Sequence, residues 1–581
     1  MSTTEQLVSN GSGVPAPSDR LLLDEAVRDA AAGAARWAEL PLGKRADLLH
    51  ETRRSIGRQA ARWVRTAADV KRLAPSSPLL GEEWTSGPYA TLMGVGALAH
   101  SVEALASGRS PVPDRALGTG PGGRVTVEAL PGSAYEWLLL NGFRATIWMP
   151  PGTSRDQVVR SAGLGQLSPG VDGGVGLVLG AGNITSIAPL DVLYELVAHN
   201  RAVVLKLNPV MAPMMSVYLA ALAPLVRDGY LRVVQGGAEA GRYLSEHQGI
   251  GHVHITGSRL THDAIVWGTG DQAERRRRAG TPLLTKPITS ELGGVSPTIV
   301  VPGRWSRRDL RYQAEHVATQ RLHNAGHNCV AAQVVLVGRD WPQKDAFLAE
   351  LRAALHRVPA RETWYPGSAR RVDTALTDHP DATRLGPDRR RLLVEVPADG
   401  DSPLTSTEYF APVLGVTELG GDPRTFLRAA VEFANTSLSG TLGANIIVAP
   451  RDRKALGADF DEAVADLRYG TIGVNAWTGL GFLSATATWG AYPGHTPEDV
   501  QSGIGVVHNA MLLDSPERTV VHGPFRPFPR SVLHGEPSLS PMPPWFATAR
   551  SAARTGELLT RFAAAPAWRR VPGIVLSAFR A

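Results

Sequence analysis

Apolar residues recur at helical spacing from Leu21 to about Leu105, as in the stretches LLLDEAVRDAAAGAARWAEL and RADLLHETRRSIGRQAARWV. A repeat of this kind is typical of amphipathic helices that bury one face. We therefore expect the chain to begin with a layer of helices. Residues 1–20 lack the charged start and apolar run of a signal peptide, and we expect them to form a disordered leader.

The period changes over residues 122–149, GGRVTVEALPGSAYEWLLLNGFRATIWM, where polar and apolar positions alternate and β-branched and aromatic residues gather. This pattern predicts strands that form a ribbon or an arm. Because an exposed arm has to bury the edges of its strands, we expect it to pair across a subunit boundary in a homodimer or homotetramer.

Between about Val175 and Ser258, short apolar runs alternate with amphipathic stretches, as in GVGLVLGAGN, ITSIAPLDVLYELVAHN and RAVVLKLNP. Strands and helices in regular alternation are typical of a doubly wound parallel sheet. A second α/β region begins at SELGGVSPTIVVPG and extends to the strand GTIGVNAW. The predicted fold class is therefore α/β, with a doubly wound parallel-sheet domain, a second α/β domain and a strand arm.

Beyond about residue 512 the sequence becomes rich in Pro and Arg before a last amphipathic stretch from Trp545 to Phe562. The apolar side of this stretch carries Trp545, Leu558, Leu559 and Phe562, and the polar side carries Arg550, Arg554 and Arg561. Two interpretations stay open: the stretch packs on the body of the protein, or it makes a peripheral contact with a membrane surface.

Composition narrows the class of protein. The chain has 581 residues, of which 43% are apolar and 20% charged, values typical of a globular protein with two or more domains. A single cysteine excludes an intramolecular disulfide framework and a Cys-rich metal site, so no metal is expected, and it fits a reducing compartment such as the cytoplasm. No window offers about eighteen uninterrupted apolar residues, as a membrane-spanning helix requires. A net charge of +6 over this length does not call for nucleic acid.

Three glycine-containing turns follow predicted strands: GAGN at residues 180–183, QGGAEAG at 235–241 and ITGS at 255–258. Such turns let helix N-termini approach phosphate groups at the carboxyl ends of strands. None of them is the GxGxxG fingerprint, so each one alone is weak evidence for a nucleotide.

The order of these turns relative to the single cysteine is more specific. Along the chain come VVLKLNP, HITGS, ELGGVSP, NAGHNC and EYFAPV. This ordered set resembles the aldehyde dehydrogenase superfamily, and the resemblance extends from about Leu21 to about Val506. It implies an NAD(P)-dependent enzyme that oxidises an aldehyde through a cysteine thiohemiacetal and a thioester.

The resemblance also implies roles for particular residues. Cys329 matches the nucleophile, Glu291 the general base, and Asn183 the amide that holds the oxyanion together with the backbone N–H of Cys329. The residues expected at the cofactor are Lys206 at the adenosine ribose, Gly241, Thr256, Gly257 and Ser258 in the turns at the dinucleotide, Glu408 at the nicotinamide ribose, and Phe410 beside it.

With this resemblance, the chain divides into five segments. After the leader we expect a dinucleotide-binding domain at residues 21–290, a catalytic domain at 291–475, a return to the cofactor domain or an oligomerisation segment at 476–511, and the tail at 512–581.

Two departures from the family pattern concern the cofactor. Pro209 stands where the family commonly has a carboxylate that contacts the adenosine 2′-hydroxyl, which makes NADP at least as plausible as NAD. The segment before ELGG is also longer than usual and contains the run Arg275 to Arg278. This run is either a solvated loop or a phosphate contact.

A third departure concerns the substrate. The sequence after Asn475 is not the usual closing pattern, and it contains Trp477, Leu480, Phe482 and Trp489. These residues suit an apolar aldehyde if they line the entry tunnel, and they are core or interface residues if they do not.

Several alternatives remain at this stage. Cys329 is also compatible with an inert core thiol, Asn183 with a helix cap, Glu291 with a solvated strand-end carboxylate, and His323 or His327 with the base of a Cys-His dyad. At the level of function, the alternatives to oxidation of an apolar aldehyde are a CoA-dependent acyl reductase of the same fold and a catalytically inactive binding or scaffold relative.

Overall fold

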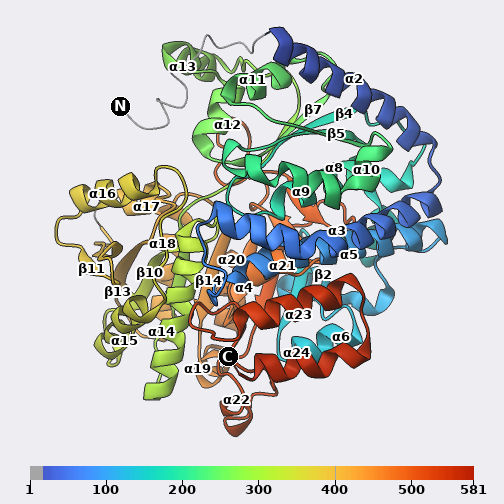
Figure 1. Ribbon diagram of the computed structural model, residues 1–581. Helices are drawn as coiled ribbons and strands as arrows, with labels where there is room; N and C mark the ends of the chain where they lie inside the picture. Colours follow the sequence, from blue (N-terminus) through green and yellow to red (C-terminus); the bar gives the residue numbers. More distant parts are fainter. Residues whose placement is uncertain (1–16, 400, 581) are drawn as a thin grey trace.

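The computed structural model describes residues 17–399 and 401–580. Two large β-sheets, each covered by helices, form its two halves (Figure 1). The mixed α/β architecture with parallel sheets confirms the predicted fold class.

The first sheet has six strands in the order β17-β8-β7-β4-β5-β6. Their bounds are β4 Val175–Leu179, β5 Ala202–Lys206, β6 Leu231–Val234, β7 His252–Gly257, β8 Ile288–Leu292 and β17 Gly503–Ile504. Strands β4 to β8 are parallel, and β17 pairs antiparallel with β8. Because successive strands extend to either side of β4, the carboxyl ends of β4 and β7 border the crevice in which sheets of this kind bind ligands.

Alternate residues of these strands face opposite helical layers, as the pleat of a strand requires. Leu177 and Val204 pack against α2 and α11 on one face, while Val178 and Leu205 pack against α3, α5 and α8 on the other. The helices of this half are α2 Pro17–Glu39, α3 Leu42–Val70, α4 Leu80–Trp84, the π-helix η1 Thr85–Tyr89, α5 Ala90–Ala106, α8 Ile187–His199, the 3₁₀ helix η5 Pro209–Met214, α9 Met215–Ala221, α10 Ala223–Arg227, α11 Ala238–Glu246, α12 Arg259–Val266 and α13 Gly270–Ala279.

The start of α2 corrects one boundary. Residues 17–20, expected in the leader, already belong to this helix. Pro17 at the first helical position and Asp19 in the first turn are residue types that favour a helix N-terminus. Residues 1–16 of the expected leader lie outside the described residues.

The second sheet has eleven strands in the order β1-β2-β3-β19-β15-β14-β9-β10-β13-β12-β11. Their bounds are β1 Leu117–Thr119, β2 Val125–Leu130, β3 Arg144–Trp148, β9 Ser296–Val300, β10 Ala332–Gly338, β11 Thr383–Leu385, β12 Arg391–Glu395, β13 Val413–Leu419, β14 Gly443–Ile447, β15 Thr471–Val474 and β19 Arg518–His522. The strands from β19 to β12 are parallel, and antiparallel strands close both ends.

Helices α14 and α15 cover one face of this sheet, and α18 and α20 cover the other. The helices of this half are α6 Ala134–Leu139, α7 Arg155–Ser161, α14 Arg307–Leu322, α15 Lys344–Arg357, α16 Ser368–Asp378, α17 Pro403–Ser406, α18 Pro423–Thr436, α19 Pro450–Leu456, α20 Ala458–Asp466 and α21 Gly479–Leu483, with the short 3₁₀ helices η2 Asp114–Ala116, η3 Pro121–Gly123 and η6 His323–Gly326. The 3₁₀ helix η4 Leu164–Leu167 packs on α8 and α5 of the first half. A separate pair, β16 Thr488–Gly490 and β18 Val506–Asn509, is antiparallel.

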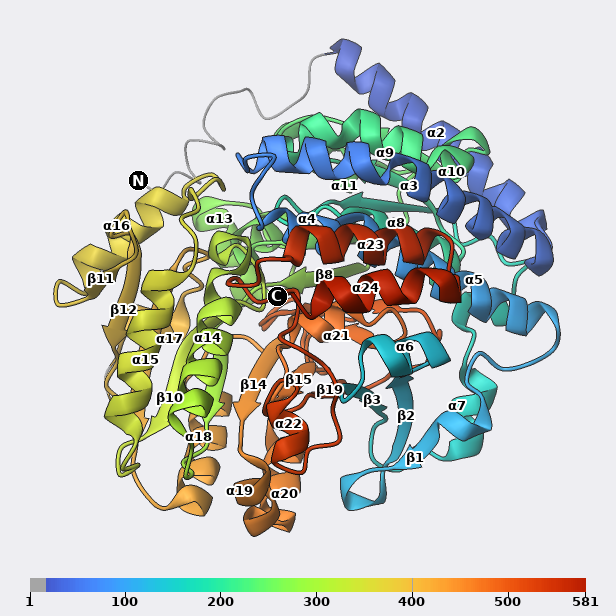
Figure 2. The ribbon, with the colours of Figure 1, turned by 60° about the horizontal axis from the view of Figure 1, so that its bottom comes forward.

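The strands of the predicted arm pair with a strand of the same chain. Residues 122–149 form β2 and β3 with α6 between them, and β3 pairs with β19 of the same chain, which pairs in turn with β15. Figure 2 shows β15, β19, β3, β2 and β1 in succession. The expectation that the arm needs a second subunit to bury its edges is therefore wrong for β3, and the oligomeric state stays a prediction.

The C-terminal tail is part of the body. It contributes β19 to the interior of the second sheet and then forms α22 Arg530–Leu533, α23 Ala552–Ala564, the 3₁₀ helix η7 Trp568–Arg570 and α24 Val571–Ala578. Trp545 and Phe562 are buried, Leu558 and Leu559 are partly buried, and the arginines of the predicted polar side are exposed. The amphipathic stretch thus packs on the protein, and no observation supports the membrane contact. Within the described ranges, no helix is both long and apolar enough to cross a bilayer.

Helix α23 packs closely on α4 and η1 (Figure 2). A Cβ atom on Gly556 of α23 would lie 2.8 Å from the Cβ of Trp84 and 3.2 Å from the backbone oxygen of Gly81. A Cβ atom on Gly573 of α24 would have no neighbour within 4 Å, so this glycine offers a matched site without the close contact.

We predict that Gly556→Ala lowers the free energy of unfolding by about 1 to 3 kcal/mol because the added methyl group forces α23 away from α4. Gly573→Ala is expected to be neutral or stabilising by up to about 1 kcal/mol, since alanine favours helix. Thermal and urea denaturation of the two variants tests this. Equal shifts in both variants would contradict the close packing of α23.

Candidate functional site

The candidate base and nucleophile lie where the two sheets meet. Glu291 is in β8 at the edge of the crevice and is 1% exposed. Its Oε2 accepts a hydrogen bond of 3.0 Å from the indole Nε1 of Trp489, and its Oε1 has no hydrogen-bond partner among the described residues. One oxygen of this carboxyl group is therefore left for a ligand or water.

Cys329 lies on the loop that joins η6 to β10 and is the one residue between positions 321 and 330 that is not buried. Burial and the nearby carboxyl groups of Glu291 and Glu408 raise the pKa of its thiol well above the usual value. Burial and the charge of Asp191 also raise the pKa of Glu291. The two groups are thus close enough to influence each other's protonation, which an inert core thiol would not require.

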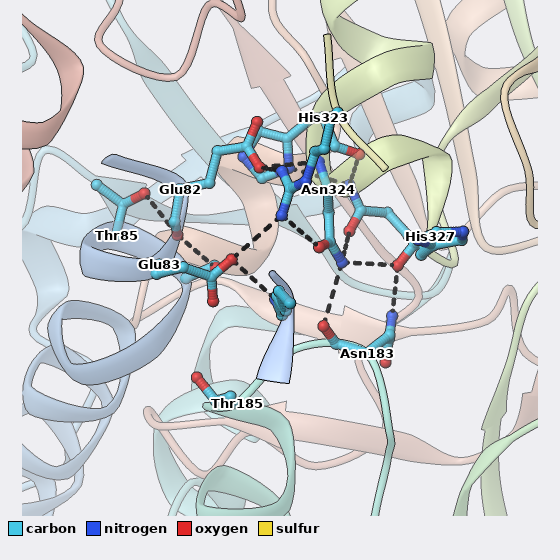
Figure 3. A network of polar contacts seen from close by, with 12 residues as sticks. Glu82, Glu83, Thr85, Asn183, Thr185, His323, Asn324 and His327 are labelled. Carbon is cyan, nitrogen blue, oxygen red and sulfur yellow. Dashed lines mark hydrogen bonds and ion pairs between the residues drawn. The ribbon is translucent and has the colours of Figure 1, made fainter. Parts of the chain in front are cut away.

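Asn183 lies in the turn after β4, facing the same loop. Its amide Nδ2 donates a 3.0 Å hydrogen bond to the backbone oxygen of His327, so one of its two N–H groups remains for a ligand (Figure 3). The N-cap of α8 is Ser186. Asn183 therefore does not cap that helix, and the capping alternative does not describe its position.

The two histidines of the cysteine loop bind other partners. A ring nitrogen of His323 lies 3.1 Å from Asn328 Nδ2, and Nε2 of His327 lies 2.9 Å from the hydroxyl of Ser368. Burial lowers the pKa of both rings. No hydrogen bond joins either ring to Cys329 within the described part of the chain, so the geometry favours a carboxylate base over a Cys-His dyad.

On the cofactor side, Lys206 ends β5, and its side-chain amine forms no hydrogen bond or ion pair with any described residue. It is 8% exposed, and burial lowers its pKa to about 8, although the charge of Glu239 acts in the opposite direction. An amine held this way at the strand end is available to a hydroxyl or phosphate group.

Glu408 lies against the glycine pair that follows the candidate base. A Cβ atom on Gly293 would lie 2.1 and 2.2 Å from the two carboxylate oxygens of Glu408, so the carboxyl group of Glu408 lies directly over this glycine. Burial raises the pKa of Glu408 to about 8 against the opposing effect of Arg321 and Arg371. Phe410 follows with φ of 45°, and its ring centroid is 5.5 Å from that of His327.

The other predicted cofactor residues lie at the same sheet edge. Gly241 is in the first turns of α11, where a Cβ atom would meet only Leu179 at 3.8 Å. Gly257 ends β7 and Ser258 caps α12 by accepting the N–H of Thr261 at 3.2 Å. Thr256 is buried, and its hydroxyl donates to Asp191 at 3.1 Å. The two helix N-termini, the free Lys206 amine and the Gly293 contact fit a nicotinamide dinucleotide.

A small cavity adjoins this site. Leu98, Leu190, Tyr194, Phe482, Trp489 and His508 are among its lining residues. Of the four residues considered for an entry tunnel, Phe482 and Trp489 line the cavity, whereas Trp477 and Leu480 belong to the core cluster against which Cys329 packs. Trp489 therefore both lines the cavity and donates the hydrogen bond to Glu291.

Sequence reasoning did not identify the polar group beside this cavity. Asp191 of α8 is fully buried, and its Oδ1 lies 3.2 Å from His508 Nε2. Burial would raise the pKa of Asp191, but His254 and His508 hold it below the usual value. An acid inside the apolar helix LDVLYELVAH was the available signal, because a buried carboxylate requires a partner.

The Arg275 to Arg278 run is helical and not a loop, because it ends α13. Arg277 pairs with Asp263 at 2.7 Å, and Arg276 donates to the backbone oxygen of Trp267 at 3.1 Å, while Arg275 and Arg278 are exposed. Two of the four guanidinium groups are thus bound within the protein. Among residues 17–399 and 401–580, no group of three or more His, Cys, Asp or Glu is placed to hold a metal ion.

Comparison with known proteins agrees with this arrangement. The model of the aldehyde dehydrogenase family matches residues 174–370. The NADP/NAD-dependent aldehyde dehydrogenase PuuC of Escherichia coli strain K12 is 29% identical over 264 residues, which are 40% of this chain and 47% of that protein. The match thus spans about half the length of this curated relative.

Solved structures extend the likeness of fold to most of the chain. The gamma-glutamyl-gamma-aminobutyraldehyde dehydrogenase of Burkholderia cenocepacia J2315 has a TM-score of 0.57 at 20% identity, covering 86% of this chain and 88% of that one. An aldehyde dehydrogenase of Mycobacterium tuberculosis complexed with NAD+ has a TM-score of 0.57 at 18% identity, covering 84% and 87%.

The fold and site define an α/β protein that brings a thiol to the ligand edge of a doubly wound sheet. The match of residues 174–370 to the aldehyde dehydrogenase family, together with the similar relatives and folds, supports membership of that superfamily. The resemblance inferred from the ordered motifs is confirmed.

We predict that Glu291→Gln shifts the pH profile of Cys329 alkylation by iodoacetamide to lower pH by about one unit. The substitution removes a negative charge beside the thiol, the thiolate is then less disfavoured, and the pKa of Cys329 falls. Glu395→Gln, at the exposed end of β12, serves as the control and leaves the profile unchanged. An unchanged profile in Glu291→Gln, or a shift to higher pH, would contradict the assigned proximity.

Proposed function

We propose that this protein oxidises an apolar aldehyde to the corresponding carboxylate with NAD or NADP as hydride acceptor. The observation that carries the proposal is that Cys329, a residue that is not completely buried, lies beside the buried Glu291 carboxyl group at the ligand edge of a dinucleotide-type sheet. Family membership supports the general reaction, and the residue roles rest on the site's geometry.

The first step is addition of the Cys329 sulfur to the aldehyde carbon. Because the pKa of the thiol is raised, its proton has to leave as the substrate binds. Glu291, whose carboxyl group acts on the thiol, accepts this proton and releases it to solvent before the thioester is hydrolysed. The free N–H of the Asn183 amide and the backbone N–H of Cys329 then donate to the alkoxide oxygen. Each such donor contributes about 3 to 4 kcal/mol in comparable oxyanion holes.

A bound nicotinamide dinucleotide supplies the acceptor to which the thiohemiacetal carbon transfers its hydride. Lys206 would bind the adenosine ribose, and Glu408, held over Gly293, would bind the nicotinamide ribose. Ser258 and the start of α12 would face the pyrophosphate, as helix N-termini do.

The second half of the reaction is hydrolysis of the thioester on Cys329. Glu291 accepts a proton from the attacking water, and a raised pKa makes this carboxylate a better base near neutral pH. A reductase that releases its acyl group to CoA needs no such base, so the buried Glu291 beside Cys329 favours the hydrolytic enzyme over that alternative.

The cavity beside Glu291 supports an apolar substrate. Its lining is mainly aliphatic and aromatic, as in sites that bind apolar ligands. Phe482 packs both on the core cluster that carries Cys329 and on Ala181 and Ile184 next to Asn183. A substrate tail in this cavity would place its carbonyl group toward the thiol. We place the reaction in a reducing compartment such as the cytoplasm, which keeps the thiol free.

We predict that the purified protein forms reduced nicotinamide with at least one member of a panel of short, aromatic and long-chain aldehydes, with NAD and NADP assayed in parallel. Cys329→Ala abolishes this turnover, and Glu291→Gln lowers it by about 10²- to 10⁴-fold because the thioester accumulates. Consumption of acyl-CoA and reduced cofactor without aldehyde oxidation would shift the assignment to the reductase. No turnover in either direction would leave the inactive relative.

Glu239 offers a test of cofactor preference. Its carboxylate lies at the N-terminus of α11 and acts electrostatically on Lys206, so it opposes a 2′-phosphate even though Pro209 supplies no acid. We predict that Glu239→Gln raises the ratio of kcat/KM for NADP to that for NAD by about 3- to 10-fold. Glu246→Gln, at the far end of the same helix, is the control. An unchanged ratio would show that Glu239 does not face the ribose.

A further inference from the structure

Two acid-base pairs are buried behind the cysteine loop, in a region that no predicted role covers. Lys71 Nζ lies 3.0 Å from Glu83 Oε1, and both side chains are fully buried. Arg361 pairs with Glu82, and these side chains are 5% and 6% exposed. Arg361 Nη2 also lies 3.5 Å from Glu83 Oε1. The two pairs come from the end of α3, from α4 and from the loop before α16.

Buried ion pairs are weak evidence for stability, because removing charges from water costs about as much as their attraction returns. Burial would raise the pKa of Glu82, but the Arg361 guanidinium holds it below the usual value. The carboxylate is therefore charged, and its role has to be sought in what it contacts.

The Glu82–Arg361 pair contacts the cysteine loop through Asn324. The backbone N–H of Asn324 donates to Glu82 Oε2 at 3.0 Å, and Arg361 Nη2 donates to the side-chain oxygen of Asn324 at 3.3 Å (Figure 3). The main chain and the side chain of one loop residue are thus both bound by one ion pair. Within the described residues, the Lys71–Glu83 pair forms no hydrogen bond with this loop.

This loop requires external support because three consecutive residues have left-handed backbone conformations. The φ angles are 54° at Asn324, 57° at Ala325 and 80° at Gly326. Glycine adopts this region readily and asparagine tolerates it, but alanine does so only at a cost. The surrounding structure must therefore hold the loop in place.

Asn324 is hydrogen-bonded in turn to the segments that carry the reactive residues. Its Nδ2 donates to the backbone oxygens of Asn183 at 3.1 Å and His327 at 3.0 Å. Asn183 Nδ2 donates to the same His327 oxygen at 3.0 Å, and Cys329 follows two residues later. Figure 3 shows this continuous path from Glu82 through Asn324 to Asn183 and His327.

We propose that Glu82 and Arg361 are positioning residues that hold the left-handed loop of Asn324 to Gly326 and thereby fix Cys329 relative to Asn183. Neither residue touches the substrate in this assignment. Its consequence for turnover rests on the proposed function, whereas its consequence for the cysteine loop does not.

The test replaces each buried pair by apolar residues of similar length, because removing both partners of an ion pair is tolerated far better than removing one. E82M/R361M removes the acceptor of the Asn324 N–H and the donor to its side chain. K71M/E83M removes an equally buried pair that makes no hydrogen bond with Asn324. It also removes the 3.5 Å contact of Glu83 with Arg361 but keeps the Glu82–Arg361 pair and both of its hydrogen bonds to Asn324, so it is the matched control. E82Q/R361M restores an oxygen acceptor for the Asn324 N–H without charge.

We expect E82M/R361M to remain folded, with kcat lowered about 10- to 100-fold, as for misplacement of reacting groups by about 1 Å, and with the KM for cofactor within about twofold. K71M/E83M keeps kcat within about threefold, and E82Q/R361M recovers much of the loss. Circular dichroism and thermal melting establish that each variant is folded.

The rate at which iodoacetamide alkylates Cys329 near pH 7 reports on the conformation of the loop, and its measurement needs no substrate. Release of the loop lessens the burial that raises the thiol's pKa, so we expect alkylation at least about threefold faster in E82M/R361M and unchanged in K71M/E83M. This readout stands even if no aldehyde is oxidised. Equal alkylation rates in the two folded variants would overturn the proposal, as would equal losses of kcat in an active enzyme.

Discussion

The site depends on the burial of one carboxyl group beside one thiol. In water Glu291 would be ionised and Cys329 mostly protonated at neutral pH, and neither would influence the other strongly. At the base of the crevice, burial raises the pKa of both groups, and each acts on the other through a medium of low polarity. The resting thiol is therefore protonated and unreactive, and the neighbouring carboxylate becomes a stronger base. Both properties arise from position, since neither residue type has them alone.

The short connection between the two sheets creates that position. Glu291 lies in β8 of the first sheet, and four residues after the end of that strand Ser296 begins β9 at the centre of the second. The carboxyl group of Glu408 lies over Gly293. A Cβ atom on Gly294 would lie 2.9 Å from the Cα of Gly440 and 2.9 Å from the hydroxyl oxygen of Ser502, which leaves little room for a side chain. The turn after β8 therefore follows the candidate base directly, contacts the candidate cofactor ligand Glu408 and connects the two domains. This explains why ELGGVSP is informative as a unit.

The sequence predicted the elements whose signals are local. Periodicity identified the opening helices, strand and helix alternation identified the first sheet, and ordered motifs identified the family. It did not predict that β3 pairs with β19 of the same chain, because strand pairing across about 370 residues leaves no local signal. The strand RTVVH was not predicted for the same reason. The Pro and Arg content of the tail around it indicated no strand. The Arg275 to Arg278 run was predicted as a loop from its charge. Its residues are helical because arginine and the neighbouring Gln, Ala and Glu favour helix.

The support of the cysteine loop escaped prediction for a different reason. Nothing local in the sequence indicates that Glu82 and Glu83 are buried, or that Lys71 and Arg361 meet them in the interior. The tail adds a further layer, because α23 lies directly on α4, the helix that carries both acids, with glycines at the points of closest approach. Packing of α23 thus excludes water from α4, and a dry α4 keeps its carboxylates bound to their cations. The composition of the C-terminal tail differs from that of the catalytic body. In the structure, however, the tail covers α4 and so shields from solvent the ion pairs that hold the loop of Cys329.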